Sequence, residues 1–372
     1  MSVICRDIIA VMEKLAPRHL AENWDNVGLL VGSLEQGVRN ILVTLDITPT
    51  VLKYAIEHDV DLIISHHPII FKGITNLRTD TPAGKLLTDL VRSGIAVYAA
   101  HTNLDIAVGG VNDVLAEKLQ LVEVRPLSEH SRQQLNKLVV YVPRDHVEPV
   151  RAAITGAGAG HIGNYSHCTF QTAGTGTFLP LEGTNPFLGR PGNLEYVEEY
   201  RLETVVPASI LSKVIEAMLQ AHPYEEVAYD VFPLLNAGQT FGLGRVGKLQ
   251  SPQSLSQLAA MVKASLALER VKVAGDGEQQ VEVVAVCGGS GGSLINAAIA
   301  AGAHVLITGD VKYHEAQLAM AAGLSVIDAG HFATEQPVVA KLAQFLQNQA
   351  EANKWQVKVI ADNFSKDIFN FW

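Results

Sequence analysis

The sequence contains few cysteines and no excess of positive charge. Among 372 residues there are three cysteines, Cys5, Cys168 and Cys287, and no two of them have CxxC spacing. This count excludes a disulfide framework and a zinc ribbon, and it suits a reducing compartment. Lysine and arginine number 28 against 38 aspartates and glutamates, which gives a formal net charge of −10. Because a nucleic-acid surface needs clustered positive charge, DNA and RNA are not expected partners.

We do not expect residues 1–17 to form an export signal, and we find no uninterrupted apolar segment of membrane length in the sequence. Residues 1–17 carry charges at helical spacing, which predicts an amphipathic helix. Residues 283–309 contain no Asp, Glu, Lys or Arg, but glycines and small polar residues divide them into strand, turn, helix and strand. We therefore predict a cytoplasmic protein that does not bind a membrane.

Apolar runs alternate with amphipathic segments in the first and last thirds of the chain. The first third contains ILVTLDIT, DLIISHH and AVYAAH, and the last third contains VEVVAVCGG, HVLITGD and LSVIDAGH. Such runs, separated by helical patterns, indicate parallel strands covered by helices. The length of the chain also exceeds that of a usual single domain.

The pattern changes in the middle of the chain, from about residue 136. The order there is strand, helix, strand, strand, helix, strand, which is typical of a ferredoxin-like α+β domain. The first and last strands of that topology lie side by side, so the domain can be inserted into a host. We predict an α/β fold with a discontinuous two-part core of βα units, 1–130 and 237–372, and an inserted ferredoxin-like domain at 131–236.

Three clusters of histidines and carboxylates fall at the ends of predicted strands. They contain His66 and His67, then Asp105, then His331 and Glu335. Taken singly, each has a structural explanation, such as a strand-end hydrogen bond, a turn or a helix cap. If the strands are neighbours in one sheet, their carboxyl ends meet and the side chains converge. This mixed nitrogen and oxygen set suits two divalent ions of zinc, iron or manganese.

Two further histidines are candidate catalytic residues. His101 lies four residues before Asp105 and is a candidate proton donor, or a residue that orients a metal ligand. His314 has the same spacing from Asp310, and this pair could bind metal or serve as acid and base at the rim of the site. His314 could also be merely solvated. We favour the rim role.

Three other motifs have both structural and functional explanations. The glycine-rich residues 288–293 could bind an anion at a helix start or form only a tight turn. Trp24, Asp25 and Asn26 could line a pocket or pack at a domain edge. The HPYEE motif at 222–226 is more typical of a junction between elements than of a metal site.

Seven motifs, in order, closely resemble the family of GTP cyclohydrolase 1 type 2 homologs, also called Nif-three-like proteins. They are ENWDNVGLLVG, ISHHPIIF, AAHTNLD, HPYEEVAYDVFPL, GLGRVGKL, GDVKYHEA and DAGHFATEQ. The resemblance covers nearly the whole chain and implies the long bacterial form with a PII-like insert. It implies that His66, His67, Asp105, His331 and Glu335 bind a dinuclear metal centre. It also implies a toroidal homohexamer with the metal sites facing an internal cavity.

Two functions of different classes follow from these observations. The first is a metal-dependent hydrolase acting on a small molecule, a nucleotide or a related phosphorylated compound, with GTP ring opening suggested by the family name. The second is a non-catalytic, hexameric metal-binding or ligand-sensing assembly in which the insert is regulatory. The residues leave the choice between them open.

Overall fold

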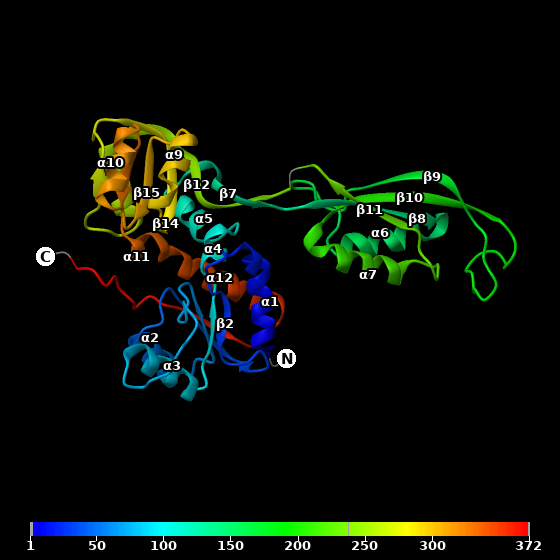
Figure 1. The fold of residues 1–372 in the computed structure, drawn as a ribbon, viewed down its shortest axis with the longest axis horizontal. Helices are drawn as coiled ribbons and strands as arrows, with labels where there is room; N and C mark the ends of the chain where they lie inside the picture. The colour runs from blue at the N-terminus through cyan, green and yellow to red at the C-terminus, as the bar shows by residue number, and fades with distance from the viewer. Residues whose placement is uncertain (1–2, 237, 371–372) are drawn as a thin grey trace. The chain divides into compact units, whose positions relative to one another are not determined.

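The fold is mixed α/β and divides into two compact units. The structure is a computed structural model that describes residues 3–236 and 238–370 (Figure 1). The core unit contains the residues up to Ser131 and those from Phe241 onwards, and the inserted unit is Arg132–Thr240. The residues on both sides of the insertion therefore belong to one unit.

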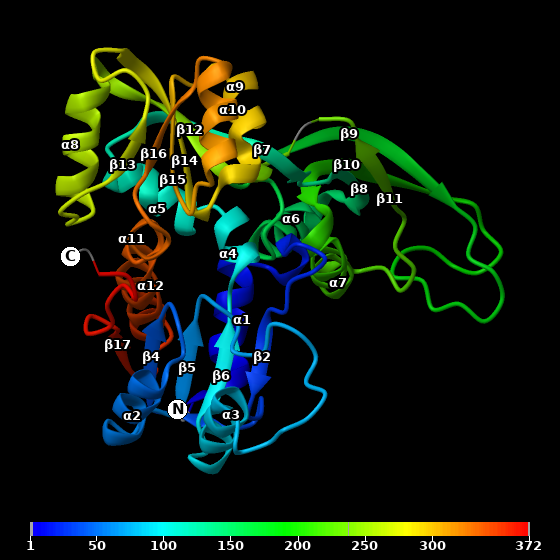
Figure 2. The ribbon, with the colours of Figure 1, turned by 60° about the vertical axis from the view of Figure 1, so that its left-hand side comes forward.

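The first sheet of the core unit has five strands in the spatial order β17-β4-β5-β6-β2. The strands are β2 (Gly28–Val31), β4 (Asn40–Thr44), β5 (Leu62–Ser65), β6 (Ala96–Ala99) and β17 (Lys358–Ala361). Strands β17, β4, β5 and β6 are parallel, and β2 pairs antiparallel with β6 (Figure 2). Because three of the parallel strands are buried on both faces, they are almost wholly apolar.

Two helices cover each face of this sheet. On one face are α1 (Cys5–Leu15) and α12 (Pro337–Ala352), which share a core with Ile41, Ile64 and Tyr98. On the other are α2 (Pro49–Glu57) and α3 (Pro82–Arg92), which pack on alternate residues of the same strands. Both α2 and α3 begin with proline after a threonine whose side chain accepts a hydrogen bond from the first turn, a strong signal for a helix start.

The second sheet of the core unit has six strands in the order β13-β16-β15-β14-β12-β7. The strands are β7 (Val122–Arg132), β12 (Thr240–Ser254), β13 (Lys272–Ala274), β14 (Gln280–Ser290), β15 (Val305–Gly309) and β16 (Ser325–Asp328). Strands β14, β15 and β16 are parallel. Helices α5 (Val111–Lys118) and α8 (Leu255–Ser265) cover one face, and α9 (Ile295–Ala300) and α10 (Tyr313–Ala321) cover the other.

Two elements from the end of the chain join the first sheet. Helix α12 packs on β4, and β17 pairs with β4 in parallel. These contacts explain how the first and last thirds of the chain form one unit. It also corrects one expectation: the strands before the three clusters do not lie in one sheet, because β5 and β6 belong to the first sheet and β16 to the second. Apolar periodicity locates strands but does not assign them to sheets.

The inserted unit is a four-stranded antiparallel sheet with two helices on one face (Figure 1). Its elements are, in chain order, β8 (Leu135–Pro143), α6 (Val147–Gly156), β9 (Thr169–Phe178), β10 (Glu195–Pro207), α7 (Leu211–Ala221) and β11 (Tyr229–Leu234). The spatial order is β11-β8-β10-β9, so the first and last strands are neighbours. The backbone of Gln133 donates to Gln239 at 2.8 Å, and the chain therefore enters and leaves the unit at one place.

Short elements complete the core unit. They are β1 (Val3–Ile4), β3 (Gly37–Val38), α4 (Thr102–Ile106) and α11 (His331–Glu335). The 3-10 turns are Arg18–Leu20 and Gly292–Leu294 in this unit, and Arg144–His146 and Ala208–Ile210 in the inserted unit. Within residues 3–236 and 238–370, no helix combines the length and the apolar character needed to cross a membrane.

Candidate metal centre

The first pair of histidines continues the backbone pairing of β5 beyond its last residue. The amide of His66 donates to the carbonyl of Thr44 at 3.0 Å, and that of His67 donates to Leu45 at 2.9 Å. Pro68 then ends the pairing, because it has no N–H to donate. Two imidazoles are thus fixed at the carboxyl end of a buried strand.

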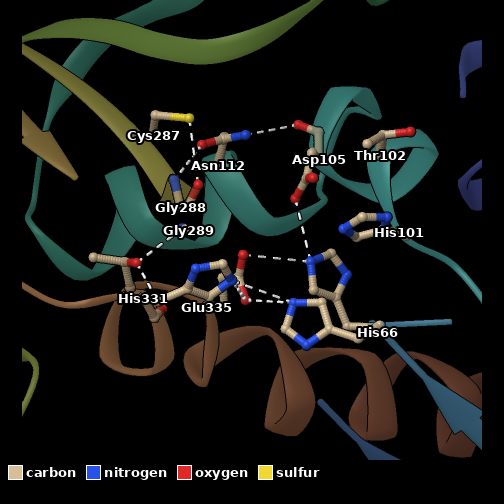
Figure 3. A network of polar contacts seen from close by, with 12 residues as sticks. His66, His101, Thr102, Asp105, Asn112, Cys287, Gly288, Gly289, His331 and Glu335 are labelled. Carbon is tan, nitrogen blue, oxygen red and sulfur yellow. Dashed lines mark hydrogen bonds and ion pairs between the residues drawn. The ribbon is translucent and has the colours of Figure 1, made fainter. Parts of the chain in front are cut away.

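Asp105 lies on α4, a single buried turn that follows β6. The amides of Leu104 and Asp105 donate to the carbonyl of His101, which starts the turn. The amide group of Asn112 donates to the Asp105 carbonyl at 2.9 Å and ties α4 to α5. This arrangement directs the Asp105 carboxylate toward His66, as Figure 3 shows.

His331 and Glu335 are the first and last residues of α11, which follows β16. Gly330 before them has a φ of 84°, a conformation that glycine adopts without strain. The i, i+4 spacing places both side chains on one face of the turn. Thr334 lies between them in sequence but donates back to the carbonyl of Gly330, so it does not compete for the site.

The carboxylate of Glu335 lies between the imidazoles of His66 and His331 (Figure 3), and it also approaches the imidazole of His67. Its Oε2 is 3.1 Å from His67 Nε2 and 3.2 Å from His331 Nε2, and its Oε1 is 3.7 Å from His66 Nε2. The Nε2 atoms of His67 and His331 are 3.4 Å apart, and His66 Nε2 is 3.5 Å from Asp105 Oδ1. The five predicted residues are therefore brought together, although two sheets supply them.

The second nitrogen of each imidazole is held by an oxygen atom. His66 Nδ1 lies 2.9 Å from the carbonyl of Ala100, and His67 Nδ1 lies 2.8 Å from Asp46. His331 Nδ1 lies 2.7 Å from Asp310. In each case an oxygen accepts the Nδ1 proton, which leaves the Nε2 lone pair directed at the centre. This orientation is typical of histidines that bind metals.

The centre contains buried acceptor atoms that lack donors. Within the described residues, His66 Nε2, Asp105 Oδ1 and Glu335 Oε2 have no geometrically acceptable hydrogen-bond partner. Leaving such atoms unpaired is costly, so something positive among them is expected. Two ligand atoms about 2.0–2.2 Å from one tetrahedral ion lie roughly 3.3–3.6 Å apart, close to the spacings measured here. The donor set therefore fits a metal ion.

Glycine gives the Glu335 carboxylate room to approach β14. A Cβ atom at Gly289, which has a φ of 63°, would lie 2.3 Å from Glu335 Oε1. The amides of Gly288, Gly289 and Gly291 already donate to side chains of the core unit. The glycine-rich segment thus accommodates the candidate metal centre, and these three amides are not free for an anion.

The charges of the centre shift the pKa values of its members. Burial lowers the pKa of His67, but the carboxylates of Asp46 and Glu335 more than offset this and raise it to about 10. Contact with Glu335 raises the pKa of His331 to about 9. Burial raises the pKa of Asp105 to about 6, whereas the imidazoles lower that of Glu335 well below its usual range despite its burial. Without a metal ion, these raised pKa values favour a proton on Nε2 of His67 and of His331, and a metal ion that binds at Nε2 displaces that proton.

Comparison with known proteins assigns the chain to a family. The family model described as Duf34/NIF3 (NGG1p interacting factor 3) matches residues 3–368. The chain belongs to the Duf34/NIF3 family. This confirms the resemblance inferred from the seven sequence motifs.

Two relatives and one solved structure, each aligned over nearly its full length, support this assignment. A Bacillus subtilis strain 168 protein named GTP cyclohydrolase 1 type 2 homolog is 45% identical over 370 residues, which cover 100% of this chain and 99% of the relative. A Mycobacterium tuberculosis protein of the same name is 40% identical over 357 residues, 95% of this chain and 94% of the relative. The crystal structure of a Bacillus cereus protein related to NIF3 superposes with a TM-score of 0.95 at 45% identity, covering all of both chains.

The two candidate catalytic histidines of this Duf34/NIF3 protein lie in different surroundings. A ring nitrogen of His101 lies within 4.8 Å of ring nitrogens of both His66 and His67, so His101 borders the centre. His314 is exposed on α10, where it contacts Gln317 and Tyr313. The contacts of His314 within the described residues do not include the five-residue centre.

Two carboxylates hold the outer nitrogens of the candidate ligands, and the sequence analysis had not singled out the first, Asp46. Asp46 follows β4 and holds His67, and it could have been found by the same strand-end argument. Asp310, which was considered as a ligand or as an acid and base, lies 2.7 Å from His331 Nδ1. The HPYEE motif bonds within the inserted unit: a ring nitrogen of His222 lies 3.0 Å from the carbonyl of Tyr141, and the Tyr224 hydroxyl donates to Glu199.

Asp25 fixes the orientation of His101. Its Oδ1 accepts the Nδ1 proton of His101 at 2.9 Å, and its Oδ2 accepts from the amide and the hydroxyl of Thr102. Burial alone would raise the pKa of Asp25, but these bonds more than offset it and lower the pKa to about 2.

Asp25→Asn is expected to destabilise the protein in a pH-dependent manner. The lowered folded-state pKa means that the ionised carboxylate stabilises the protein fully above its unfolded pKa of about 3.9 and loses this effect as the pH falls towards 2. At pH 7 we expect the free energy of unfolding to fall by about 1–3 kcal/mol, measured by urea denaturation. The exposed Asp145→Asn is the control. A difference in the free energy of unfolding between Asp25→Asn and wild type that stayed constant between pH 7 and pH 2 would contradict this account.

Proposed function

We propose that this Duf34/NIF3 protein is a hydrolase that holds two divalent metal ions and acts on a nucleotide or a related phosphorylated compound. The observation that carries the proposal is the convergence of His66 Nε2, Asp105 Oδ1 and Glu335 Oε2, three buried acceptors without donors. A buried cluster of this kind needs a positive partner. The name of the relatives, GTP cyclohydrolase 1 type 2 homolog, supports a nucleotide as the substrate class.

The distances favour two adjacent metal positions that share Glu335. The first would be held by His66 Nε2, Asp105 Oδ1 and Glu335 Oε1. The second would be held by His67 Nε2, His331 Nε2 and Glu335 Oε2. Mixed imidazole and carboxylate ligands suit zinc, iron or manganese. Three protein ligands for each position leave room for water or substrate.

The remaining chemistry belongs to the residues around the centre. When bound, divalent ions of this kind activate water and polarise a substrate oxygen. His101 has its Nδ1 proton held by Asp25, so its Nε2 can accept a proton from water or donate one to a leaving group. The buried carboxyl ends of β5 and β6 fix the ligand side chains before the substrate arrives.

The proposal is tested by incubating the metal-loaded protein with GTP and a panel of nucleotides. We expect turnover of at least one of them by the wild type, and none by Glu335→Ala under the same conditions. His331→Ala provides a second variant, because His331 is 39% exposed and its loss disturbs the core less. Wild-type turnover equal to that of both variants, for every nucleotide and each of zinc, iron and manganese, would contradict the proposal.

A further inference from the structure

Two exposed aromatic side chains lie together beside the candidate metal centre. Trp24 is 57% exposed and Phe71 is 46% exposed, although both are large and apolar. Their ring centroids are 5.7 Å apart, with an angle of 48° between the planes. An exposed apolar pair next to buried polar chemistry is typical of a binding site.

The loop that carries Trp24 is held firmly from both sides. The residue after Trp24 is Asp25, whose carboxylate accepts three hydrogen bonds from His101 and Thr102. The side-chain amide of Asn26 donates to the carbonyl of Ile70, the residue before Phe71. This hydrogen bond ties the segment of Trp24 to the segment of Phe71. The pair is therefore ordered before anything binds, which lowers the entropic cost of binding.

The aromatic pair is continuous with the centre through His101. The ring centroid of His101 is 6.0 Å from that of Trp24 and 6.4 Å from that of Phe71. The ring centroid of His101 is also 5.2 Å from that of His66 and 5.5 Å from that of His67. His101 is therefore a neighbour both of the aromatic pair and of the candidate ligands His66 and His67.

We propose that Trp24, with Phe71 beside it, stacks a planar heteroaromatic ring of the substrate and presents the edge of that ring to His101. This inference rests on the proposed function, because it names the part of the nucleotide that the site recognises. Each stacked pair of rings needs roughly 4.5 Å between centroids, so 5.7 Å leaves no space for a third ring between the two side chains. The substrate ring therefore lies on the outer face of Trp24. Every nucleobase has an aromatic face that can stack on an aromatic side chain, so both purines and pyrimidines can bind in this way.

The test measures the binding of guanosine, adenosine, cytidine and ribose 5-phosphate to the metal-loaded protein by isothermal titration calorimetry. Loss of one stacking partner weakens binding about 5- to 150-fold, so Trp24→Ala is expected to lose nucleoside affinity by that factor. Trp24→Phe is expected to stay within a few-fold of wild type. Ribose 5-phosphate has no aromatic ring to stack, and its binding is expected to be the same in all variants. Tyr196→Ala, at an aromatic residue of the inserted unit that is 70% exposed, is the control.

Several results would overturn the inference. These are undetectable nucleoside binding by the wild type, equal affinity of Trp24→Ala and wild type, or a change in oligomeric mass of Trp24→Ala in analytical ultracentrifugation. The last would make the pair a contact between copies of the chain. Nucleoside binding that depends on Trp24, without turnover, would support this inference and contradict the hydrolase. Turnover with an unchanged KM in Trp24→Ala would do the reverse.

Discussion

Glu335→Gln is expected to abolish the stabilisation that bound metal gives the protein. The carboxylate is 3% exposed and lies between three imidazoles, so both proposed metal positions depend on it. A ligand present at a thousand times its Kd stabilises the folded state by about 4 kcal/mol. The wild type should therefore lose several kcal/mol when a chelator is added, as measured by urea denaturation. Glutamine keeps the shape of the side chain but lacks the negative charge, so the variant should show no such loss.

The matched control is Glu117→Gln, at an exposed glutamate that contacts Lys341. It should respond to the chelator as the wild type does. Glu335→Gln is also expected to be less stable than the wild type without metal, because the negative charge of Glu335 compensates the positive charge of the neighbouring imidazoles. For this reason the measurement compares each protein with and without chelator. An equal chelator effect in Glu335→Gln and wild type would show that Glu335 binds no ion that stabilises the fold.

Arg245→Met is expected to destabilise the core unit by about 3–5 kcal/mol, because it leaves the partly buried Asp113 carboxylate and several buried carbonyls without their donor. Arg245 is 2% exposed and pairs with Asp113 of α5. Its guanidinium also donates to the carbonyls of Gly242, Gly244 and Ala107 at 2.8–3.0 Å. Methionine fills similar volume but leaves these buried acceptors unpaired. Ala107 follows α4 directly, so the loss should also loosen the turn that carries Asp105.

Urea denaturation of metal-free protein measures this effect without a contribution from bound ions. The control is Arg6→Met, which removes an arginine that pairs with Glu35 at the surface, both side chains being at least 60% exposed. An exposed pair contributes about 0–1 kcal/mol, so the control should be close to wild type. A loss below about 1 kcal/mol for Arg245→Met would show that the described contacts of Arg245 do not stabilise the fold.

The sequence predicted the chemistry of the strand ends better than their arrangement. The apolar runs before His66 and His331 identify strands whose carboxyl ends carry polar residues. The sequence did not predict that α12 and β17, from the end of the chain, join the first sheet, because β17 is four residues long and only half-buried. Periodicity also does not reveal that β16 lies in a second sheet. The distances around Glu335 depend on that packing, and so they could not be predicted from spacing.

The surroundings of the candidate ligands were predicted only in part. Asp46 has the same strand-end position as the predicted residues, but a lone aspartate after a strand usually forms only a turn. The segment 288–293 had two interpretations, an anion site formed by free backbone amides or a tight strand-to-helix turn. In the structure, Gly289 instead makes room for the Glu335 carboxylate. A glycine that allows close approach and one that forms a turn are identical in sequence.

The central claim is that the five-residue centre holds two metal ions, and elemental analysis of the purified protein tests it most directly. The wild type should contain about two equivalents of zinc, iron or manganese per chain. The double variant His67→Ala, Glu335→Ala should contain close to none, because both proposed positions lose a ligand. Circular dichroism would establish that the variant is folded. Equal metal content in the folded variant and the wild type would contradict the claim.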